Sequence, residues 1–315
     1  MTQITTNTEK TYIAGHRGMV GSAIARNFNK SSKKWVGQTH NQMDLTSLTA
    51  VQEYFYNERP DYVIVAAARV GGIKDNNDYP VDYLMTNLSI SSNIIKSAYQ
   101  FSCKKLLFLG SSCIYPRECP QPIKEEYLLT GPLESTNQWY AMAKITAIKM
   151  CQAYRKQYGC NYISAMPCNL YGINDTYDVN RSHVIPGLIT KFHKAKVNKE
   201  PFVECWGTGK ALREFLYSDD LASAVSLIME SYNQPEPINI GSGEEIAIKD
   251  LVPLVAKTVG YDGDIKWNNS VGDGTPRKVM DNSKIRKLGW KPTISLEEGI
   301  KLSYNDFQLR YGESL

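Results

Sequence analysis

The sequence lacks the long apolar runs that a membrane-spanning protein needs. Its longest strongly apolar stretches, such as 63–68, fall far short of the roughly 18 residues of a membrane-spanning helix and are typical of buried strands. The first ten residues, MTQITTNTEK, also lack the apolar core of a signal peptide. We therefore expect a protein without a leader and without a membrane partner.

Paired cysteines are missing as well. The chain has seven cysteines, an odd number, and they are scattered without a single Cys-x-x-Cys pair. This pattern argues against both a disulfide framework and a zinc site, and it is typical of free thiols in a reducing compartment. We expect a cytoplasmic protein with no bound metal.

A strong charge of either sign is absent too. The net charge of +4 on 315 residues gives no reason to expect nucleic acid, although it suits an anionic small ligand. With 42% hydrophobic residues, the composition is that of an ordinary globular protein, long enough for one large or two modest domains.

Short apolar strands alternate with helical patterns over the first half of the chain. Strands are predicted at 11–14, 34–37, 61–68, 105–110 and 161–167, and helices at 48–57, 81–101 and 136–158. Such alternation predicts an α/β fold, with a doubly wound parallel Rossmann-type sheet covered on both faces. Ligands of these sheets bind at the carboxyl ends of the strands.

The pattern loosens after about residue 170, where proline and glycine interrupt it. Helices are still predicted at 182–196, 218–231, 247–259 and 295–306. We expect residues 1–170 to form the dinucleotide-binding domain, allowing for later strands and helices that return to it. Residues 171–315 would form a smaller, mixed α/β substrate-binding domain.

Three glycines follow the first predicted strand at a spacing of three, as Gly15, Gly18 and Gly21. Glycine permits a tight turn and lets the backbone approach a pyrophosphate, and the next helix offers its N-terminal amides to the phosphates. The alternative is a plain turn with a helix cap. The strand before and the helix after favour the dinucleotide loop, which would place seven residues at the cofactor: Gly15, His16, Arg17, Gly18, Met19, Val20 and Gly21.

The end of the second strand indicates which dinucleotide is bound. An acid there would bind the ribose hydroxyls and repel a 2′-phosphate, yet the segment 37–41 reads GQTHN. Arg17 and His40 can both face a phosphate, so we predict NADP rather than NAD. Asp44 either contacts adenine or caps the following helix.

Tyr140 is the one tyrosine of twenty that has a lysine four residues later, Lys144. On a helix the two side chains share a face, and the lysine would lower the pKa of the phenol while holding a ribose hydroxyl. Taken alone, the pair is better explained by an amphipathic helix with an exposed tyrosine and lysine. The surrounding motifs favour the catalytic interpretation.

Further reactive side chains follow the strands. Ser111, after the fourth strand, could bind a substrate carbonyl together with Tyr140. Cys113 is either a small buried hydrophobe or an acid/base group. His183 is either a proton shuttle or a helix-capping or surface histidine. Together these side chains suggest deprotonation next to a ketone, reprotonation on the other face, and hydride reduction of that ketone.

Five stretches make the chain resemble a known family. They are IAGHRGMVGSAI (13–24), AARVGGIKDNN (67–77), LLFLGSSCIYP (106–116), SHVIP (182–186) and DGTPRK (273–278). From Tyr12 to about Tyr304 the chain resembles the GDP-L-fucose synthase family, within the extended short-chain dehydrogenase/reductase superfamily. These enzymes are NADPH-dependent 3,5-epimerase/4-reductases that act on GDP-4-keto-6-deoxy-D-mannose.

The resemblance implies roles for individual residues. Tyr140 would donate the proton in reduction, with Lys144 as its partner and Ser111 as the carbonyl ligand, while Cys113 and His183 would be the epimerisation base and acid. Besides the glycine loop, the cofactor would contact His40, Gly110, Ser112, Lys144, Pro167, Cys168, Asn169, Leu170 and His183. The GDP-sugar would contact Asn169, Val184, Leu188, Lys191, Trp206, Arg213, Asp273 and Lys278.

From the residues alone, Trp206 would be assigned to core packing and Arg213 to a surface ion pair.

The family also implies a homodimer in which helices 81–101 and 136–158 form a four-helix bundle. Two positions depart from the family pattern: His40 stands where arginine is common, and Lys191 where arginine is usual.

Other functions of the same fold fit less well. A 4,6-dehydratase would show an acidic pair where Ser112 and Cys113 stand. A simple 4-epimerase would keep a tightly held NAD and would not need Cys113 and His183. Another nucleotide-sugar 4-epimerase/reductase of the same superfamily stays the alternative. A non-catalytic NADP-sensing protein should have lost Tyr140 or Lys144.

Overall fold

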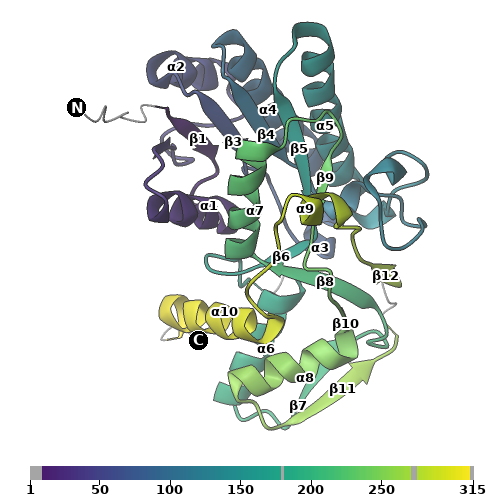
Figure 1. Ribbon diagram of the computed structural model, residues 1–315. Coiled ribbons are helices and arrows are strands. Elements are labelled where there is room, and N and C mark those ends of the chain that lie inside the picture. Colours follow the sequence, from purple (N-terminus) through teal and green to yellow (C-terminus); the bar gives the residue numbers. More distant parts are fainter. Residues whose placement is uncertain (1–8, 179–180, 271–274, 313–315) are drawn as a thin grey trace.

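The computed structural model describes residues 9–178, 181–270 and 275–312. Its upper part in Figure 1 is built on one six-stranded sheet with the strand order β2-β1-β3-β4-β5-β9. All neighbouring strands of this sheet are parallel. The strands are β1 (Thr11–Ala14), β2 (Trp35–Val36), β3 (Tyr62–Val65), β4 (Lys105–Leu109), β5 (Tyr162–Pro167) and β9 (Ile238–Ile240).

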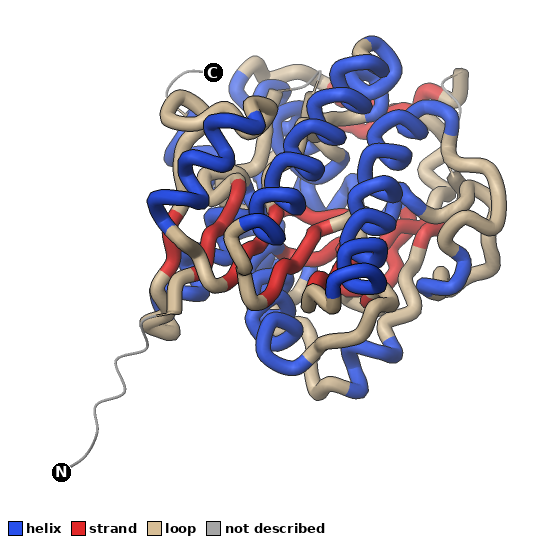
Figure 2. Tube along the Cα trace, turned by 90° about the horizontal axis from the view of Figure 1, so that it is seen from above, coloured by secondary structure: helices blue, strands red, loops and turns tan. Residues whose placement is uncertain are grey.

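Helices cover both faces of this sheet, as the view from above in Figure 2 shows. On one face α4 packs against both α2 and α5, and on the other α1 packs along α7. Both faces of β4 are therefore buried, which explains its continuous apolar run. The helices are α1 (Met19–Lys30), α2 (Leu48–Glu58), α4 (Pro80–Gln100), α5 (Gln138–Tyr158) and α7 (Ser218–Ser231).

The strand order reverses between β1 and β3, and the glycine loop lies at this switch point. Gly15 adopts a φ of +83°, and a side chain there would come within 2.8 Å of the backbone of Ala67. At Gly21 a Cβ would lie 2.0 Å from the carbonyl oxygen of Gly15. The loop thus needs glycine at both positions for its turn and for the close approach of α1.

The lower part of the molecule in Figure 1 has its own small sheets and its own core. Strand β8 (Leu212–Tyr217) pairs with β6 (Asn169–Tyr171), β10 (Glu245–Ala247) and β12 (Arg277–Lys278). A second pair joins β7 (Phe202–Trp206) to β11 (Asp264–Asn268). The buried apolar side chains come mainly from these strands and from three helices: α6 (Val184–Val197), α8 (Ile248–Val259) and α10 (Leu296–Tyr311).

Some later elements return to the large sheet. Strand β9 adds to its edge beside β5, and α7 is tied to α1 by an ion pair between Arg26 and Asp219. Ser226 also donates a hydrogen bond of 2.6 Å to the Asn27 side chain. The chain therefore passes between the two parts more than once, and the division into domains near residue 170 stays a prediction.

The predicted α/β fold with its parallel Rossmann-type sheet is confirmed, and the predicted helices lie within a few residues of the observed ones. The sequence patterns missed two short helices, α3 (Ile73–Asp78) and α9 (Ser283–Lys287), and the small strands of the lower part. These elements have too few residues to show a period.

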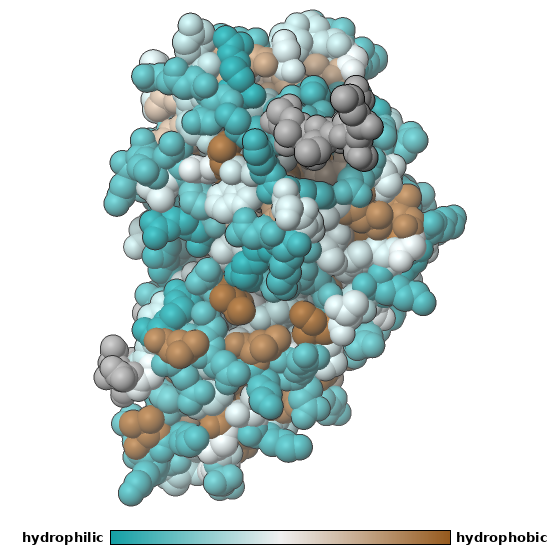
Figure 3. Space-filling view, turned by 60° about the vertical axis from the view of Figure 1, so that its left-hand side comes forward, coloured by the Kyte–Doolittle hydropathy of each residue, from teal (hydrophilic) through white to brown (hydrophobic). Residues whose placement is uncertain are grey.

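The surface on the face drawn in Figure 3 is largely hydrophilic, with apolar side chains in small separate groups. Over the described ranges, no helix is both long and apolar enough to cross a lipid bilayer. Nor do three or more histidine, cysteine or acidic side chains of those ranges gather into a possible metal site. All seven cysteines are free thiols.

We predict that Gly21→Ala destabilises the fold, because the added methyl group would collide with the Gly15 carbonyl. The free energy of unfolding, measured by urea denaturation, should fall by about 1–3 kcal/mol. Gly18→Ala is the matched control, since its Cβ would meet only the Gly15 oxygen at 3.5 Å. Equal midpoints for the two variants would contradict this account of the loop.

Candidate active site

Ser111 and Tyr140 meet at the carboxyl end of β4. The Ser111 hydroxyl is hydrogen-bonded to the Tyr140 hydroxyl, and it also accepts a bond of 3.2 Å from the Cys113 amide. The Tyr140 ring packs edge-on against Tyr83, with 6.4 Å between the ring centroids. The structure therefore joins the serine and tyrosine that the sequence predicted to bind one carbonyl oxygen.

Lys144 lies one turn along α5 from Tyr140 and is 4% exposed. Its Nζ donates a hydrogen bond of 2.7 Å to the Leu109 carbonyl oxygen at the end of β4. The same nitrogen lies 5.7 Å from the centroid of the Tyr140 ring. Burial lowers the pKa of Lys144 to about 7, because an ammonium group loses its hydration there.

The prediction that Lys144 lowers the pKa of the phenol is wrong for this structure. Burial raises the pKa of Tyr140, and the negative charge that Cys113 can carry raises it further. The hydrogen bond from Ser111 opposes both effects but does not outweigh them. The lysine points to a backbone carbonyl rather than to the hydroxyl, so desolvation controls the phenol.

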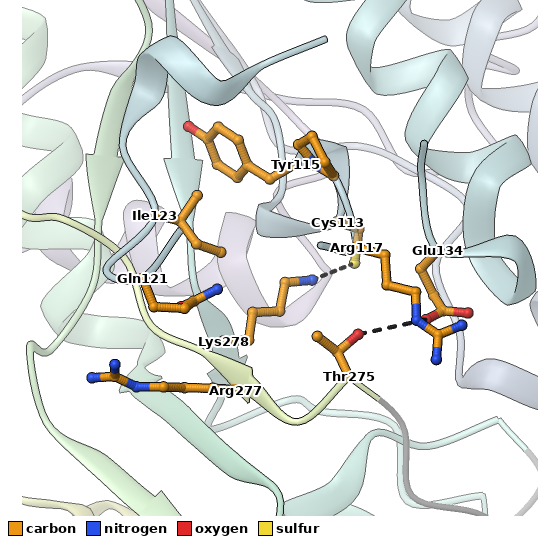
Figure 4. Close-up of a pocket in the computed structure, with 10 residues that line it drawn as sticks. Cys113, Tyr115, Arg117, Gln121, Ile123, Glu134, Thr275, Arg277 and Lys278 are labelled. Atoms are coloured by element: carbon orange, nitrogen blue, oxygen red, sulfur yellow. Dashed lines mark hydrogen bonds and ion pairs between the residues drawn. The ribbon is translucent and has the colours of Figure 1, made fainter. Parts of the chain in front are cut away.

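Cys113 lies close enough to Tyr140 for its charge to act on the phenol. Two side chains point at its sulfur: Asn137 donates from Nδ2 at 3.4 Å, and Lys278 from Nζ at 3.7 Å. Figure 4 shows the lysine reaching the sulfur from the opposite wall of the pocket. The thiol is partly exposed and has polar partners, so this environment favours the acid/base interpretation over that of a buried hydrophobe.

His183 is the N-cap residue of α6, and its side chain makes no capping hydrogen bond. The residue is exposed, as the surface-histidine alternative predicts, yet desolvation by nearby parts of the chain lowers the pKa of its imidazole. Gly72 donates a hydrogen bond of 2.9 Å to the Arg181 carbonyl, which fixes the segment before it. Within the described parts of the chain, no hydrogen bond joins His183 to Cys113 or Tyr140, so its role stays a prediction.

The glycine loop offers a cradle that fits a dinucleotide phosphate. Helix α1 begins after Gly18 without a side-chain cap and without an acidic residue in its first turn, so its amides remain available to an anion. Arg17 is exposed beside them. His16 lies beneath, with a buried Nδ1 that has no hydrogen-bond partner among the described residues. Burial and the charge of Arg17 lower the pKa of His16.

His40 is exposed on the loop beyond β2. Asp44 accepts hydrogen bonds from the Thr46 amide at 2.9 Å and the Thr46 hydroxyl at 2.8 Å. The cap of α2 is Ser47, whose hydroxyl accepts from the Ala50 amide. The helix-capping alternative for Asp44 is therefore wrong, and its contact with adenine stays a prediction.

The other predicted cofactor residues lie at the ends of β4 and β5. Gly110 is buried, and a Cβ there would lie 2.4 Å from the Met166 sulfur. Ser112 and Cys168 are also buried, and burial raises the pKa of the Cys168 thiol well above its usual value. The Asn169 side chain donates to the Glu214 carbonyl at 2.9 Å. The segment from Pro167 to Leu170 can therefore border a cofactor mainly through its backbone.

The predicted substrate residues come from the lower part of the molecule. Lys191 donates to the Glu204 carbonyl, and its Nζ lies 5.9 Å from the Trp206 ring. Trp206 is 67% exposed, so its assignment to the core is wrong. Arg213 is partly buried and donates to the Leu212 carbonyl at 2.8 Å. Val184 is exposed and Leu188 partly buried at the start of α6, while Asp273 lies outside the described residues.

Two groups at the site were missed from the sequence. Asn137, three residues before Tyr140, reaches the Cys113 sulfur, and an amide one turn before the tyrosine is a weak but readable signal. Asp75 accepts a hydrogen bond of 2.5 Å from the Tyr83 hydroxyl, directly behind Tyr140. This pair explains part of the AARVGGIKDNN stretch, which packs against the turn that begins α5.

Comparison with known proteins agrees with this geometry. A family model described as "NAD dependent epimerase/dehydratase family" matches residues 11–241. The chain is 52% identical to GDP-L-fucose synthase 1 of Arabidopsis thaliana, over 94% of this chain and 92% of that protein. It is 46% identical to the GDP-L-fucose synthase of Escherichia coli, over 95% of this chain and 96% of that one.

A solved structure is similar along the whole chain. The GDP-L-fucose synthetase of Naegleria fowleri, bound to NADP, superposes with a TM-score of 0.91 at 31% identity, and the match covers 98% of this chain and 95% of that one. The chain therefore belongs to the NAD dependent epimerase/dehydratase family and, within it, to the GDP-L-fucose synthases.

Proposed function

We propose that this chain converts GDP-4-keto-6-deoxy-D-mannose to GDP-L-fucose in two steps. The first step inverts C3 and C5, and the second reduces the C4 ketone with NADPH. The observation that carries this proposal is the grouping of Ser111, Tyr140 and Cys113 at the end of one strand. A carbonyl oxygen held by the two hydroxyls would have its neighbouring carbons within reach of a thiol.

NADPH supplies the hydride for the reduction when it is bound. The Tyr140 hydroxyl donates its proton to the substrate oxygen, while Ser111 hydrogen-bonds the same oxygen. A phenol carries its proton at neutral pH, and burial raises the pKa of Tyr140 further in the same direction. Lys144, fixed by the Leu109 carbonyl, would hold a ribose hydroxyl beside the phenol.

The cofactor's adenosine phosphate would lie at the glycine loop. The open N-terminus of α1 suits the pyrophosphate, and the exposed Arg17 and His40 suit a 2′-phosphate. The NADP bound to the Naegleria fowleri relative supports this assignment. A cytoplasmic location belongs to the same proposal and is supported by the free state of all seven thiols.

The epimerisation needs an acid and a base on opposite faces of the sugar. Cys113, as thiolate, would remove a proton from carbon next to the ketone, and the electron pair would pass to the carbonyl oxygen held by Ser111 and Tyr140. His183 would then return a proton to the other face of the carbon. The diphosphate would lie among the cations Lys191 and Arg213, with Trp206 against a flat face of the ligand.

We predict that Tyr140→Phe slows the reduction by about 10²–10⁴, because the phenylalanine cannot donate a proton. The rate is measured as loss of NADPH absorbance with saturating GDP-4-keto-6-deoxy-D-mannose. Tyr154→Phe, on the same helix but far from Ser111, is the control and should retain the wild-type rate. Retention of half the activity or more by Tyr140→Phe would refute the assigned proton donor, and no turnover by the wild type would refute the function.

Cys113→Ser should slow the epimerisation more than the reduction, because an alcohol is a far weaker base than a thiol. Epimerisation is measured without NADPH, as incorporation of solvent deuterium at C3 and C5. Reduction is measured as NADPH oxidation, with the stereochemistry of the product determined. His183→Asn should show the same imbalance, and equal slowing of both steps in either variant would exclude that residue from the epimerisation.

We also propose that the protein is a homodimer that pairs through α4 and α5. Large apolar side chains are exposed on both helices, and they are Val81, Met85, Tyr99, Trp139, Met142 and Tyr158. The two helices pack side by side, so a second copy could complete a four-helix bundle over this face.

Met142→Glu should convert the dimer to a monomer at micromolar concentration, because the carboxylate would be buried in the bundle. Sedimentation equilibrium gives the mass directly. Leu309→Glu, at a side chain that is 88% exposed on α10, is the control and should stay dimeric. A monomeric wild type, or a dimeric Met142→Glu variant, would contradict the proposed interface.

A further inference from the structure

We propose that Lys278 is a positioning residue for the epimerisation, which holds the Cys113 sulfur in place as a thiolate. The inference rests on the proposed function, because it assigns a new role within the same site. Its starting point is the distance of 3.7 Å between the lysine Nζ and the cysteine Sγ. The resemblance to the family had placed Lys278 among the ligands of the GDP-sugar.

The backbone around Lys278 is fixed on both sides, so the position of its side chain is not accidental. In β12, Lys278 pairs with Arg213 of β8. The next residue, Val279, donates to the Gln121 side chain at 3.0 Å and accepts from the Ile123 amide at 2.8 Å. The loop after Cys113 and the strand that carries Lys278 are thereby tied together.

Alternation along β12 sends its two side chains to opposite sides. Arg277 points away from the sulfur and forms two hydrogen bonds with Glu245, at 2.6 and 2.8 Å. Lys278 points to the other side, toward Cys113, as Figure 4 shows. The arginine is thus occupied by a carboxylate, whereas the lysine faces the thiol.

The charge of this lysine is not neutralised by a carboxylate among the described residues. Glu134 is the acid in the same pocket, and it engages Arg117 at 3.6 Å and Thr275 at 3.5 Å instead. Asn137 adds a second donor to the sulfur at 3.4 Å. One uncompensated ammonium and one amide therefore surround an atom that is better satisfied as an anion.

This arrangement suits the proton transfer that the epimerisation requires. The carbon–hydrogen bond next to the ketone breaks, a sulfur–hydrogen bond forms, and the electron pair moves to the oxygen held by Ser111 and Tyr140. The negative charge therefore leaves the sulfur and appears at the two hydroxyls. Lys278 stabilises the thiolate that exists before the proton transfer. Removal of the lysine would therefore reduce the fraction of Cys113 that can act as a base.

The test measures the thiol directly, without substrate or cofactor. Wild type, Lys278→Met and Lys278→Gln are treated with iodoacetamide at pH 7.5, and alkylation of Cys113 is followed by peptide mass spectrometry. Cys160 serves as the internal reference, because it is partly exposed and lies at the amino end of β5, whereas Cys113 follows the carboxyl end of β4. The loss of the ammonium should slow alkylation of Cys113 by about tenfold relative to Cys160.

In Lys278→Met and Lys278→Gln, deuterium incorporation at C3 and C5 without NADPH should fall in parallel with the alkylation of Cys113. The affinity of these variants for GDP should stay within twofold of the wild type. Lys278→Arg should restore much of the Cys113 reactivity, because it keeps the charge. Lys284→Met is the matched control, since that lysine pairs with Glu125 at 3.5 Å and should leave both readouts unchanged. Retained binding of NADPH shows that each variant is folded, and the glutamine variant serves if the methionine variant is not.

Unchanged alkylation of Cys113 in both neutral variants would overturn the inference. A large loss of GDP affinity with unchanged alkylation would assign Lys278 to the diphosphate instead. If Cys113 alkylation depends on Lys278 but the wild type exchanges no deuterium, the pairing of the two side chains stands and the proposed reaction fails.

Discussion

The site depends on one hydrogen bond, from the Lys144 Nζ to the Leu109 carbonyl oxygen at the last residue of β4. It fixes the start of α5 over the carboxyl end of the central strand. Tyr140 lies one turn earlier on that helix and Ser111 two residues beyond that strand, so one contact brings both hydroxyls together. The cost is a desolvated amine, which explains why the pKa of Lys144 falls to about 7.

A second constraint joins the lower part of the molecule to the active site at the carboxyl end of β4. The Glu214 carboxylate is fully buried, and it accepts hydrogen bonds from the Gly243 amide at 2.6 Å, the Met280 amide at 2.9 Å and the Asn282 side chain at 3.1 Å. Three donors offset part of the cost of burying the charge, although burial still raises the pKa of Glu214. The segment that follows Lys278 is thereby held against β8. The Asn169 side chain donates a hydrogen bond to the backbone carbonyl of Glu214 as well.

The sequence predicted the sheet well because its buried strands are continuous apolar runs and its glycines are required by a turn that other residues cannot form. It predicted the Ser111–Tyr140 pair because Ser111 lies just after the strand β4 and Tyr140 lies in the first turn of the helix α5. The contact of Lys278 with Cys113 joins positions 165 residues apart. It depends on the pairing of a two-residue strand, for which no periodic pattern exists. The exposure of Trp206 was missed for a different reason: Trp206 shares the exposed face of β7 with Glu204, and a tryptophan by itself favours assignment to the core.

The error about the phenol is the most informative one for the mechanism. Helical spacing predicts that Lys144 is near Tyr140, but it says nothing about where the ammonium points or how much water is lost. In the structure the amine faces a carbonyl, the pKa of the phenol is raised, and the hydroxyl keeps its proton at neutral pH. A protonated phenol can donate a proton, which agrees with the proposed reduction of a ketone. The Cys113 thiol beside it faces a lysine and an amide, so the groups proposed as acid and base lie in different environments.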